Sequence, residues 1–328
     1  MKIKHGKDYK QEKNINATYP VLGTGGVITY IDSFLCDWNC VCIGRKGTIN
    51  KPIYMDEPFW SVDTLFYSIP NVRENPKFQY YLFQTINWLK YNAASGVPSL
   101  SSSTIESIPI SRPFELEQKK ISTFLTVLDN KIKKQEELIE AIKSYKRGAL
   151  RKVFDFTEEP FRSATLGELC HITTGKLDAN AMVEKGKYRF YTCAKEHYYI
   201  NTYAFNTEAL LISGNGANVG YIHHYNGKFN AYQRTYVLTD FVGVNPTFLE
   251  YYLETYLSER IESEKKAGNT PYIVLSTLSE MKIICPNIKN QNTISKLFKH
   301  LDLKIKKEED VLYCLQDLKN GLLQKMFI

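Results

Sequence analysis

The feature that most limits how this chain can fold is an internal repeat. The 34 residues from 121 to 154 align with those from 294 to 327 at a constant offset of 173 residues, without a gap. Fourteen of these positions are identical, among them the motif KIKK, which begins at Lys131 and again at Lys304. A match of this length indicates a tandem duplication in which each half is one structural unit.

The repeated segment has the apolar spacing of a coiled coil. Apolar residues recur at steps of four and three in both copies, which is the 3.5-residue period of a helix-pairing seam, and neither copy contains proline. Polar residues interrupt the seam at the same two places, Gln135 and Lys146 in the first copy and Glu308 and Lys319 in the second. Because polar seam positions fix register, these matching interruptions predict that the two helices pair with each other, antiparallel. The predicted helix–helix seam consists of Ile121, Leu125, Leu128, Ile132, Ile139, Ile142, Ile294, Phe298, Leu301, Ile305, Leu312 and Leu315.

The alternative is that each helix is an ordinary amphipathic helix packed only on its own domain. Helices of globular proteins usually end sooner than these runs do, so the paired arrangement is favoured.

The repeat continues upstream of the helices. FQYYLFQT (78–85) resembles FLEYYLET (248–255), and positions between 98 and 113 match positions between 271 and 286. Short apolar runs separated by glycine turns fill 19–70 and 188–245, which is typical of β-strands. In each half a helical stretch (78–92 and 246–265), a polar loop and an Ile- and Pro-rich exit strand then lead into the long helix.

We therefore predict an α+β fold with two similar mixed α/β domains and two long helices that form an antiparallel coiled coil. The first domain is expected over 1–118, the first helix over 119–154, the second domain over 155–291 and the second helix over 292–328.

Composition narrows the class of protein. The 42 Lys and Arg residues exceed the 35 Asp and Glu residues, giving a net charge of +7, which is compatible with a nucleic-acid partner without demanding one. No apolar run approaches the length of a membrane span, and the start has no signal-peptide core. Seven cysteines, an odd number, do not suggest a disulfide framework. We expect a reduced, cytoplasmic protein that does not contact a membrane.

The order of these parts resembles the specificity subunits of type I restriction–modification systems. The resemblance rests on the GTGG turn at 23–26, the GRKG loop at 44–47, and the exit segments SGVPSLSSSTIESIPISRP (95–113) and AGNTPYIVLSTLSEMKIICP (267–286). It covers nearly the whole chain. It implies two target-recognition domains that each read one half of a split DNA site, and two spacer helices that dock two modification (methyltransferase) subunits.

The two halves differ at their starts. The second domain opens with FRSATLGELCHITTG (161–175), whereas Met1 falls opposite about residue 170. We therefore expect the first target-recognition domain to be N-terminally shortened, without a leading strand of the Leu-Gly-Glu-Leu kind.

Candidate DNA-reading residues lie in glycine-flanked and polar loops. Arg and Lys pair with guanine, and Asn and Gln pair with adenine, while flanking glycines let the backbone approach the duplex. A plain turn or surface role is an equal alternative for each candidate, since turns favour Gly and Asn. The candidates are Arg45, Lys46, Lys51, Asn215, Asn218, Gln233, Arg234, Lys265, Lys266 and Asn269.

Catalytic motifs are incomplete. The sixth position of the glycine fingerprint that begins at Gly23 is Ile28, no Walker A loop occurs, and NTPY (269–272) departs from the NPPY motif of amino-methyltransferases. Cys36, Cys40 and Cys42 crowd one segment without a second cysteine pair, so buried core thiols are favoured over a metal site. We expect no catalytic residue, no metal and no cofactor in this chain, with S-adenosylmethionine bound by the partner.

The sequence therefore predicts a subunit that recognises a bipartite, asymmetric DNA site. Its expected partners are double-stranded DNA, two modification subunits and a restriction (nuclease and translocase) subunit. One alternative is a non-catalytic coiled-coil scaffold whose domains bind protein. Another is an enzyme with its own nuclease or methyltransferase activity.

Overall fold

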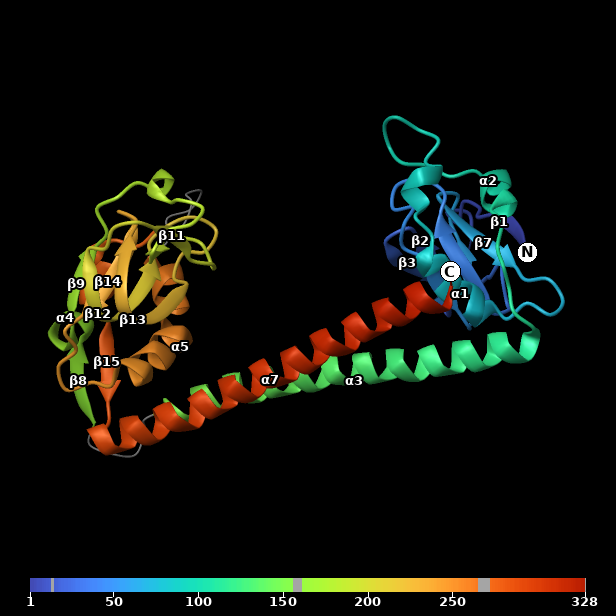
Figure 1. Ribbon diagram of the computed structural model, residues 1–328. Helices are drawn as coiled ribbons and strands as arrows, with labels where there is room; N and C mark the ends of the chain where they lie inside the picture. The colour runs from blue at the N-terminus through green and yellow to red at the C-terminus, as the bar shows by residue number, and fades with distance from the viewer. Residues whose placement is uncertain (13–14, 156–160, 265–271, 328) are drawn as a thin grey trace. The chain divides into compact units, whose positions relative to one another are not determined.

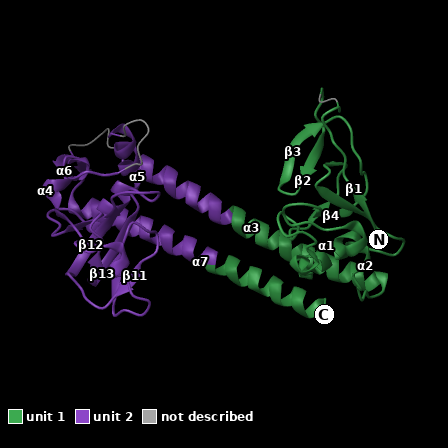
Figure 2. Ribbon diagram, turned by 90° about the horizontal axis from the view of Figure 1, so that it is seen from above, with its two compact units in different colours: residues 1–137, 310–328 green, residues 138–309 purple. Residues whose placement is uncertain are grey.

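The computed structural model describes residues 1–12, 15–155, 161–264 and 272–327, and the chain divides into two compact units (Figure 2). Unit 1 contains residues 1–137 and 310–328, and unit 2 contains residues 138–309. Each unit therefore combines one domain with part of each long helix. Both domains mix sheets with helices, as predicted for the α+β class.

Unit 1 holds two small sheets. Four antiparallel strands follow the order β1-β7-β4-β5, and β2 lies between β3 and β6 in a three-stranded sheet. Helix α1 covers the larger sheet, because Phe83 packs with Ile43 and Phe66 in one buried cluster. The elements are β1 (Lys2–His5), β2 (Tyr19–Gly23), β3 (Gly26–Ile31), β4 (Cys40–Gly44), β5 (Ile53–Met55), β6 (Trp60–Ser61), β7 (Leu65–Ile69), α1 (Pro76–Thr85), η1 (Trp88–Tyr91) and α2 (Ser102–Ser107).

Unit 2 holds a six-stranded sheet of order β11-β10-β13-β12-β14-β9 and a separate pair, β15-β8. Strand β12 is buried on both faces: Leu210 packs with Phe248 of α5, and Leu211 with Phe229 of β13. The elements are β8 (Arg162–Thr165), α4 (Leu166–Leu169), β9 (His171–Thr174), η2 (Ala179–Ala181), β10 (Tyr188–Tyr191), β11 (Tyr198–Ile200), β12 (Phe205–Ser213), β13 (Ile222–Ala231), β14 (Thr235–Thr239), α5 (Pro246–Glu264), α6 (Leu275–Ser279) and β15 (Lys282–Cys285).

The two long helices are α3 (Glu115–Val153) and α7 (Ile288–Met326), each of 39 residues. Each begins four residues before its predicted start, shortly after Pro113 or Pro286, which favours an extended residue before it. At ~1.5 Å per residue, a helix of this length is about 58 Å long.

In each unit, α3 and α7 run antiparallel (Figure 1). In unit 1, Asp129 of α3 pairs with Lys319 of α7 at 2.7 Å. In unit 2, Lys146 of α3 pairs with Asp302 of α7 at 2.6 Å. Lys143 also pairs with Glu309 in unit 2, and Gln316 donates to Glu136 in unit 1. Within each unit the numbers therefore rise along one helix as they fall along the other, and the predicted antiparallel pairing is confirmed.

The predicted seam is the buried side of these helices. All of its twelve named residues are buried or half-buried, and Leu125 and Phe298, which are equivalent in the repeat, are both 0% exposed. The neighbouring Phe124 and Leu297 are each 51% exposed. The 3.5-residue period therefore located the buried face correctly.

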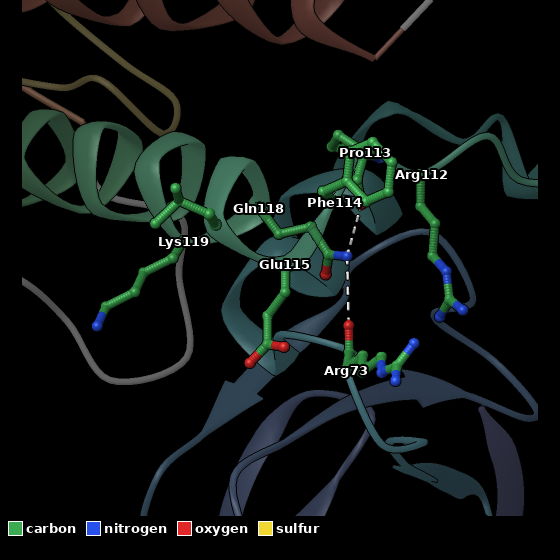
Figure 3. Close-up of a pocket in the computed structure, with 8 residues that line it drawn as sticks. Arg73, Arg112, Pro113, Phe114, Glu115, Gln118 and Lys119 are labelled. Atoms are coloured by element: carbon green, nitrogen blue, oxygen red, sulfur yellow. Dashed lines mark hydrogen bonds between the residues drawn. The ribbon is translucent and has the colours of Figure 1, made fainter.

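A glutamine at the start of each long helix joins the helix to its domain. The Oε1 atom of Gln118 accepts a hydrogen bond from the backbone N–H of Asn75 at 3.0 Å, and Gln291 does the same for Asn245 at 2.7 Å. The Gln118 amide also donates to the carbonyl oxygen of Pro113 at 2.9 Å, and its counterpart makes the equivalent bond at 2.8 Å (Figure 3). Asn75 and Asn245 are the N-terminal caps of α1 and α5. This joint is the same in both units.

The exit strand predicted for both halves forms only in the second. In unit 2, β15 pairs with β8 in antiparallel register. In unit 1 the equivalent residues 109–112 belong to no strand, and the described part of that unit contains no counterpart of β8. The prediction for the first half was wrong because a strand needs a partner as well as a suitable sequence. No helix in the described ranges is both long and apolar enough to cross a membrane.

Candidate nucleic-acid interface

The candidate reading residues of the two domains lie at equivalent strand ends. In unit 1 they follow β4, at the point where its neighbour β7 begins. In unit 2 they follow β12 and precede its neighbour β14. An isolated β-bridge also joins each loop to the segment before a short helix. It pairs Lys46 with Ser99 before α2 in unit 1, and Asn215 with Tyr272 before α6 in unit 2. The fold thus places both sets of candidate residues at the ends of equivalent strands.

In unit 1 the GRKG loop is held rigidly by its backbone. The N–H of Arg45 donates to the carbonyl of Thr64 at 2.8 Å, and the N–H of Gly47 donates to that of Pro98 at 2.8 Å. Gly47 has a φ of +98°, and a Cβ on Gly44 would collide with the carbonyl of Thr48. Both glycines are therefore required by the loop's shape.

The side chains of this loop differ in their freedom. Arg45 forms an ion pair with Asp63, with 2.6 Å between Nη1 and Oδ1, and both side chains are more than a third exposed. Lys46 and Lys51 are exposed. A base contact by Arg45 therefore requires exchange of Asp63 for the base, whereas the two lysines are available to phosphates as they stand.

In unit 2, three candidates gather around one pocket of about 320 Å³. Asn215, Gln233 and Arg234 line it together with Tyr236 and Tyr272. The Gln233 amide donates to Asp178 at 2.8 Å. Among the residues that the structure describes, the side chains of Asn215 and Arg234 make no hydrogen bond or ion pair. Within the described ranges, these two therefore present donors and acceptors of the kind that base reading requires.

Asn218 lies apart from this pocket. Its side-chain amide donates to the backbone carbonyl of Cys193 at 3.0 Å, and its backbone carbonyl accepts from the backbone N–H of Tyr221. The side chain therefore supports the turn before β13. Lys265, Lys266 and Asn269 fall outside the described residues. DNA contact by these four, as by the other six candidates, stays a prediction.

Sequence reasoning missed a cluster of tyrosines and cations on β10 and β13. The Arg189 guanidinium lies 4.5 Å from the ring centre of Tyr225 and donates to the hydroxyl of Tyr191 at 3.3 Å. That hydrogen bond raises the pKa of Arg189. Lys228 lies 4.8 Å from the ring centre of Tyr203, which is 45% exposed. The signal was present as tyrosines interleaved with basic residues between 188 and 203, a composition suited to a polar, negatively charged partner.

The crowded cysteines are core residues. Cys36, Cys40 and Cys42 are each 0% exposed, and the Sγ atoms of Cys36 and Cys40 lie 3.7 Å apart. The hydrogen bond to Cys40 and burial both raise the pKa of the Cys36 thiol, which keeps it protonated. Within the described ranges, no group of three or more His, Cys, Asp or Glu residues is placed to hold a metal ion.

Comparison with known proteins agrees with this architecture. The family model described as "Type I restriction modification DNA specificity domain" matches twice, over residues 1–144 and 158–312. The type I restriction enzyme EcoDI specificity subunit of Escherichia coli is 38% identical over 135 residues, which are 41% of this chain and 30% of that protein. The match therefore spans less than a third of that relative's length.

Solved structures share the fold. The type I restriction–modification S subunit from M. genitalium matches with a TM-score of 0.70 at 19% identity, over 99% of this chain and 93% of that one. A chain solved in work on complex assembly and conformational transition of the type I R-M system matches with a TM-score of 0.58 at 16% identity, over 88% of this chain and 81% of that one.

Proposed function

The chain belongs to the type I restriction–modification DNA specificity family, and on this premise we propose that it reads a bipartite DNA sequence for a modification complex. One observation carries the proposal: two repeat-related domains place different polar side chains at equivalent strand ends. A duplicated frame with different reading residues is what recognition of two different half-sites requires.

Unit 1 favours guanine and phosphate contacts. Arg45 supplies the two-pronged donor that pairs with the O6 and N7 atoms of guanine in the major groove, and exposed Lys46 and Lys51 are suited to phosphates. Asp63 holds Arg45 in the free protein and is replaced by the base on binding. This exchange costs the ion pair, so it favours bases that accept two hydrogen bonds over those that accept one.

Unit 2 favours a mixed half-site. The amides of Asn215 and Gln233 suit the N6 and N7 atoms of adenine, and Arg234 suits guanine. Tyr272, which is 57% exposed beside them, is placed to pack on the edge of the duplex. Because the two sets of side chains differ, the two half-sites differ and the target is asymmetric.

The long helices would act as the spacer and as the docking surface for the modification subunits. Three pairs of repeat-equivalent apolar residues lie next to the seam, all at the same heptad position. In an antiparallel pair of helices, residues at this position of both helices border the seam on the same side. Each is 43% to 67% exposed: Phe124 and Leu297, Leu138 and Val311, Tyr145 and Leu318. Phe124, Val311 and Leu318 belong to unit 1, and the three equivalent residues to unit 2. Two equivalent apolar sets fit two copies of one partner.

Methyl transfer would be performed by these partners, each with its own S-adenosylmethionine, and cleavage by a restriction subunit that joins the same complex. The chain's part is to choose the site, in the cytoplasm where the cell's DNA lies.

The proposal is tested by selecting binding sites from random duplexes with the purified complex of this chain and its modification subunits at moderate salt. The expected result is two short conserved blocks of different sequence, separated by a fixed number of unspecified base pairs. Recovery of duplexes without any common sequence contradicts it and favours the protein-binding scaffold, because phosphate contacts alone carry no sequence preference.

A further inference from the structure

The side chain of Gln233, a candidate reading residue of unit 2, is held by a carboxylate. Its Nε2 atom donates to Oδ1 of Asp178 at 2.8 Å. An ionised carboxylate only accepts hydrogen bonds, so the nitrogen of the amide, and not its oxygen, must face Asp178. Both side chains are exposed, and Gln233 lines the pocket of about 320 Å³. The remaining edge of the amide is therefore accessible to a partner.

The backbone keeps the two side chains next to each other. The backbone N–H of Gln233 donates to the carbonyl of Leu177, the residue before Asp178, at 2.9 Å. Gly175 packs so closely on Ala231 that a Cβ at this glycine would collide with the carbonyl oxygen of Ala231. The segment that carries the carboxylate is thus tied to the segment that carries the amide, and the pair is already formed in the free protein.

The Asp178 carboxylate has no other structural task. Asp178 is the N-terminal cap of η2, and its backbone carbonyl accepts from the N–H of Ala181 at 3.1 Å, but its side chain forms no capping hydrogen bond. Aspartate at such a position usually caps the helix with its side chain. Among the residues that the structure describes, this carboxylate forms no ion pair and no second hydrogen bond. It is therefore available to orient the amide of Gln233.

The orientation of the amide decides which base it fits. With its outer N–H bound to Asp178, Gln233 presents Oε1 and its inner N–H side by side, which matches the N6 donor and the N7 acceptor of adenine. Guanine presents two acceptors at this edge, O6 and N7, so Oε1 would meet O6 without a hydrogen atom between them. An amide that turns over can offer its nitrogen to O6, but this turn would place Oε1 against the carboxylate.

We propose that Asp178 is a positioning residue that locks the Gln233 amide in the orientation for adenine and so excludes guanine from one position of the half-site of unit 2. This inference rests on the proposed function and names the base that its site accepts. Unit 1 uses a carboxylate differently. Asp63 holds Arg45, which must leave it to reach a base, whereas Gln233 reads the base while it stays bound to Asp178.

The test uses the complex of this chain with its modification subunits and duplexes that carry the selected motif, with fluorescence anisotropy to measure binding. Base pairs of the motif are changed one at a time, and the position at which Gln233→Ala removes the base preference is the position that Gln233 reads. We expect adenine there, favoured over guanine by about 5- to 150-fold in the wild-type complex. Purine, which lacks the N6 amino group, and 7-deazaadenine, which lacks the N7 acceptor, should each bind more weakly than adenine by about fivefold or more.

Asp178→Asn separates orientation from structure. An asparagine can donate to Oε1 as well as accept from Nε2, so the Gln233 amide is free to turn over. The preference for adenine over guanine should then fall below about fivefold. Glu184→Gln removes the same charge from another exposed residue between β9 and β10, and it should leave this ratio unchanged.

The outcomes distinguish this inference from the proposed function. The inference alone is overturned by an unchanged adenine preference in Asp178→Asn, by an equal loss of affinity for both bases, by guanine at the position that Gln233 reads, or by a motif in which no position responds to Gln233→Ala. Selection of duplexes without any common sequence overturns the proposed function, and this inference with it.

Discussion

The two units share the joint between domain and helix and differ in their candidate reading loops and in the pairing of the segment that leads into each long helix. In unit 1, Tyr81 of α1 donates to Asp129 at 2.8 Å, and Asp129 also holds Lys319 of the other helix. The domain, its own helix and the opposite helix therefore meet at one carboxylate.

Unit 2 repeats this arrangement with one addition. Tyr251 donates to Asp302 at 2.6 Å, and Asp302 holds Lys146. A second carboxylate, Glu254, lies 3.6 Å from the Lys146 ammonium, whereas its repeat equivalent in unit 1 is Gln84. Burial raises the pKa of Glu254 against the lowering effect of Lys146. The comparison teaches that the duplication kept the contacts that fix each domain on the helices and let the reading loops and one edge diverge.

The largest expected effect tests whether the seam stabilises the two units equally. Leu125→Ala and Phe298→Ala remove repeat-equivalent, fully buried seam side chains. Each should lower the free energy of unfolding by about 2–5 kcal/mol, since both leave cavities in a packed core. Urea unfolding, followed by tryptophan fluorescence for unit 1 and by far-UV circular dichroism for the chain, measures this.

The exposed neighbour Phe124 provides the control. Phe124→Ala should change the free energy of unfolding by no more than about 0.5 kcal/mol. If Phe124→Ala lowers the free energy of unfolding as much as Leu125→Ala does, the seam has been assigned to the wrong face of the helix.

A smaller effect should separate the two ion-pair clusters. Lys146→Met leaves Asp302 and Glu254 facing each other, whereas Lys319→Met leaves Asp129 with its hydrogen bond from Tyr81 and with Gln84 in place of a second carboxylate. Because the carboxylates are about a third exposed, solvent weakens both losses. We expect about 1–2 kcal/mol for Lys146→Met and about half of that for Lys319→Met. Equal losses from thermal unfolding of the two variants would show that Glu254 adds nothing.

The ion pair of Arg45 gives a prediction on DNA binding. Asp63→Asn removes the charge that competes with DNA for Arg45. Affinity of the complex for non-specific duplex should rise about 2- to 10-fold at low salt, and the rise should shrink as salt is added. Asp37→Asn removes the same charge at an exposed residue of unit 1 that is not the ion-pair partner of Arg45, and it serves as the control. Unchanged affinity in Asp63→Asn would show that Arg45 does not reach the DNA.

The smallest expected effect is a pH dependence confined to unit 2. His224 lies between Glu250 at 2.7 Å and Glu208 at 2.9 Å. Burial disfavours the charged ring, but the hydrogen bonds to the two carboxylates outweigh it, and the pKa of His224 is raised from 6.5. The stabilisation is therefore fully present below the unfolded pKa and is lost as pH rises through the higher folded value.

Burial lowers the pKa values of His197 and His223, which acts in the opposite direction but equally in both chains. The difference in melting temperature between the wild-type chain and His224→Gln should therefore fall by up to about 4 °C between pH 6 and pH 8. An identical pH profile in the variant contradicts the assignment. A calorimetric scan at each pH measures both.

The sequence predicted what repeats along one helix and missed what depends on contacts between distant segments. The 3.5-residue period selected helix residues that are all buried or half-buried, and matching polar interruptions predicted antiparallel pairing. It could not show that Lys146 and Lys319 would be held by aspartates, because those partners lie on the opposite helix. It also predicted an exit strand near Ile110 that did not form, since its partner strand has no counterpart in the described part of unit 1.

The candidate site was predicted in part. Loop composition selected Arg45, Asn215 and Arg234, and the fold placed them at equivalent strand ends. The same reasoning selected Asn218, whose side chain supports a turn, because glycine and asparagine serve turns and DNA contacts alike. Arg189 was missed, because its tyrosine neighbours come from strands that are adjacent only in the folded sheet.

The central claim is that each unit reads its own half of the target, and paired single substitutions test it most directly. Arg45→Ala and Arg234→Ala chains are each assembled with the modification subunits, and methylated adenines are mapped at base resolution on genomic DNA. We predict that each variant loses sequence preference in one block of the motif, a different block for each, while the other block and the spacing stay unchanged. Loss of preference in the same block by both variants, or an unaltered motif in both, would contradict the account.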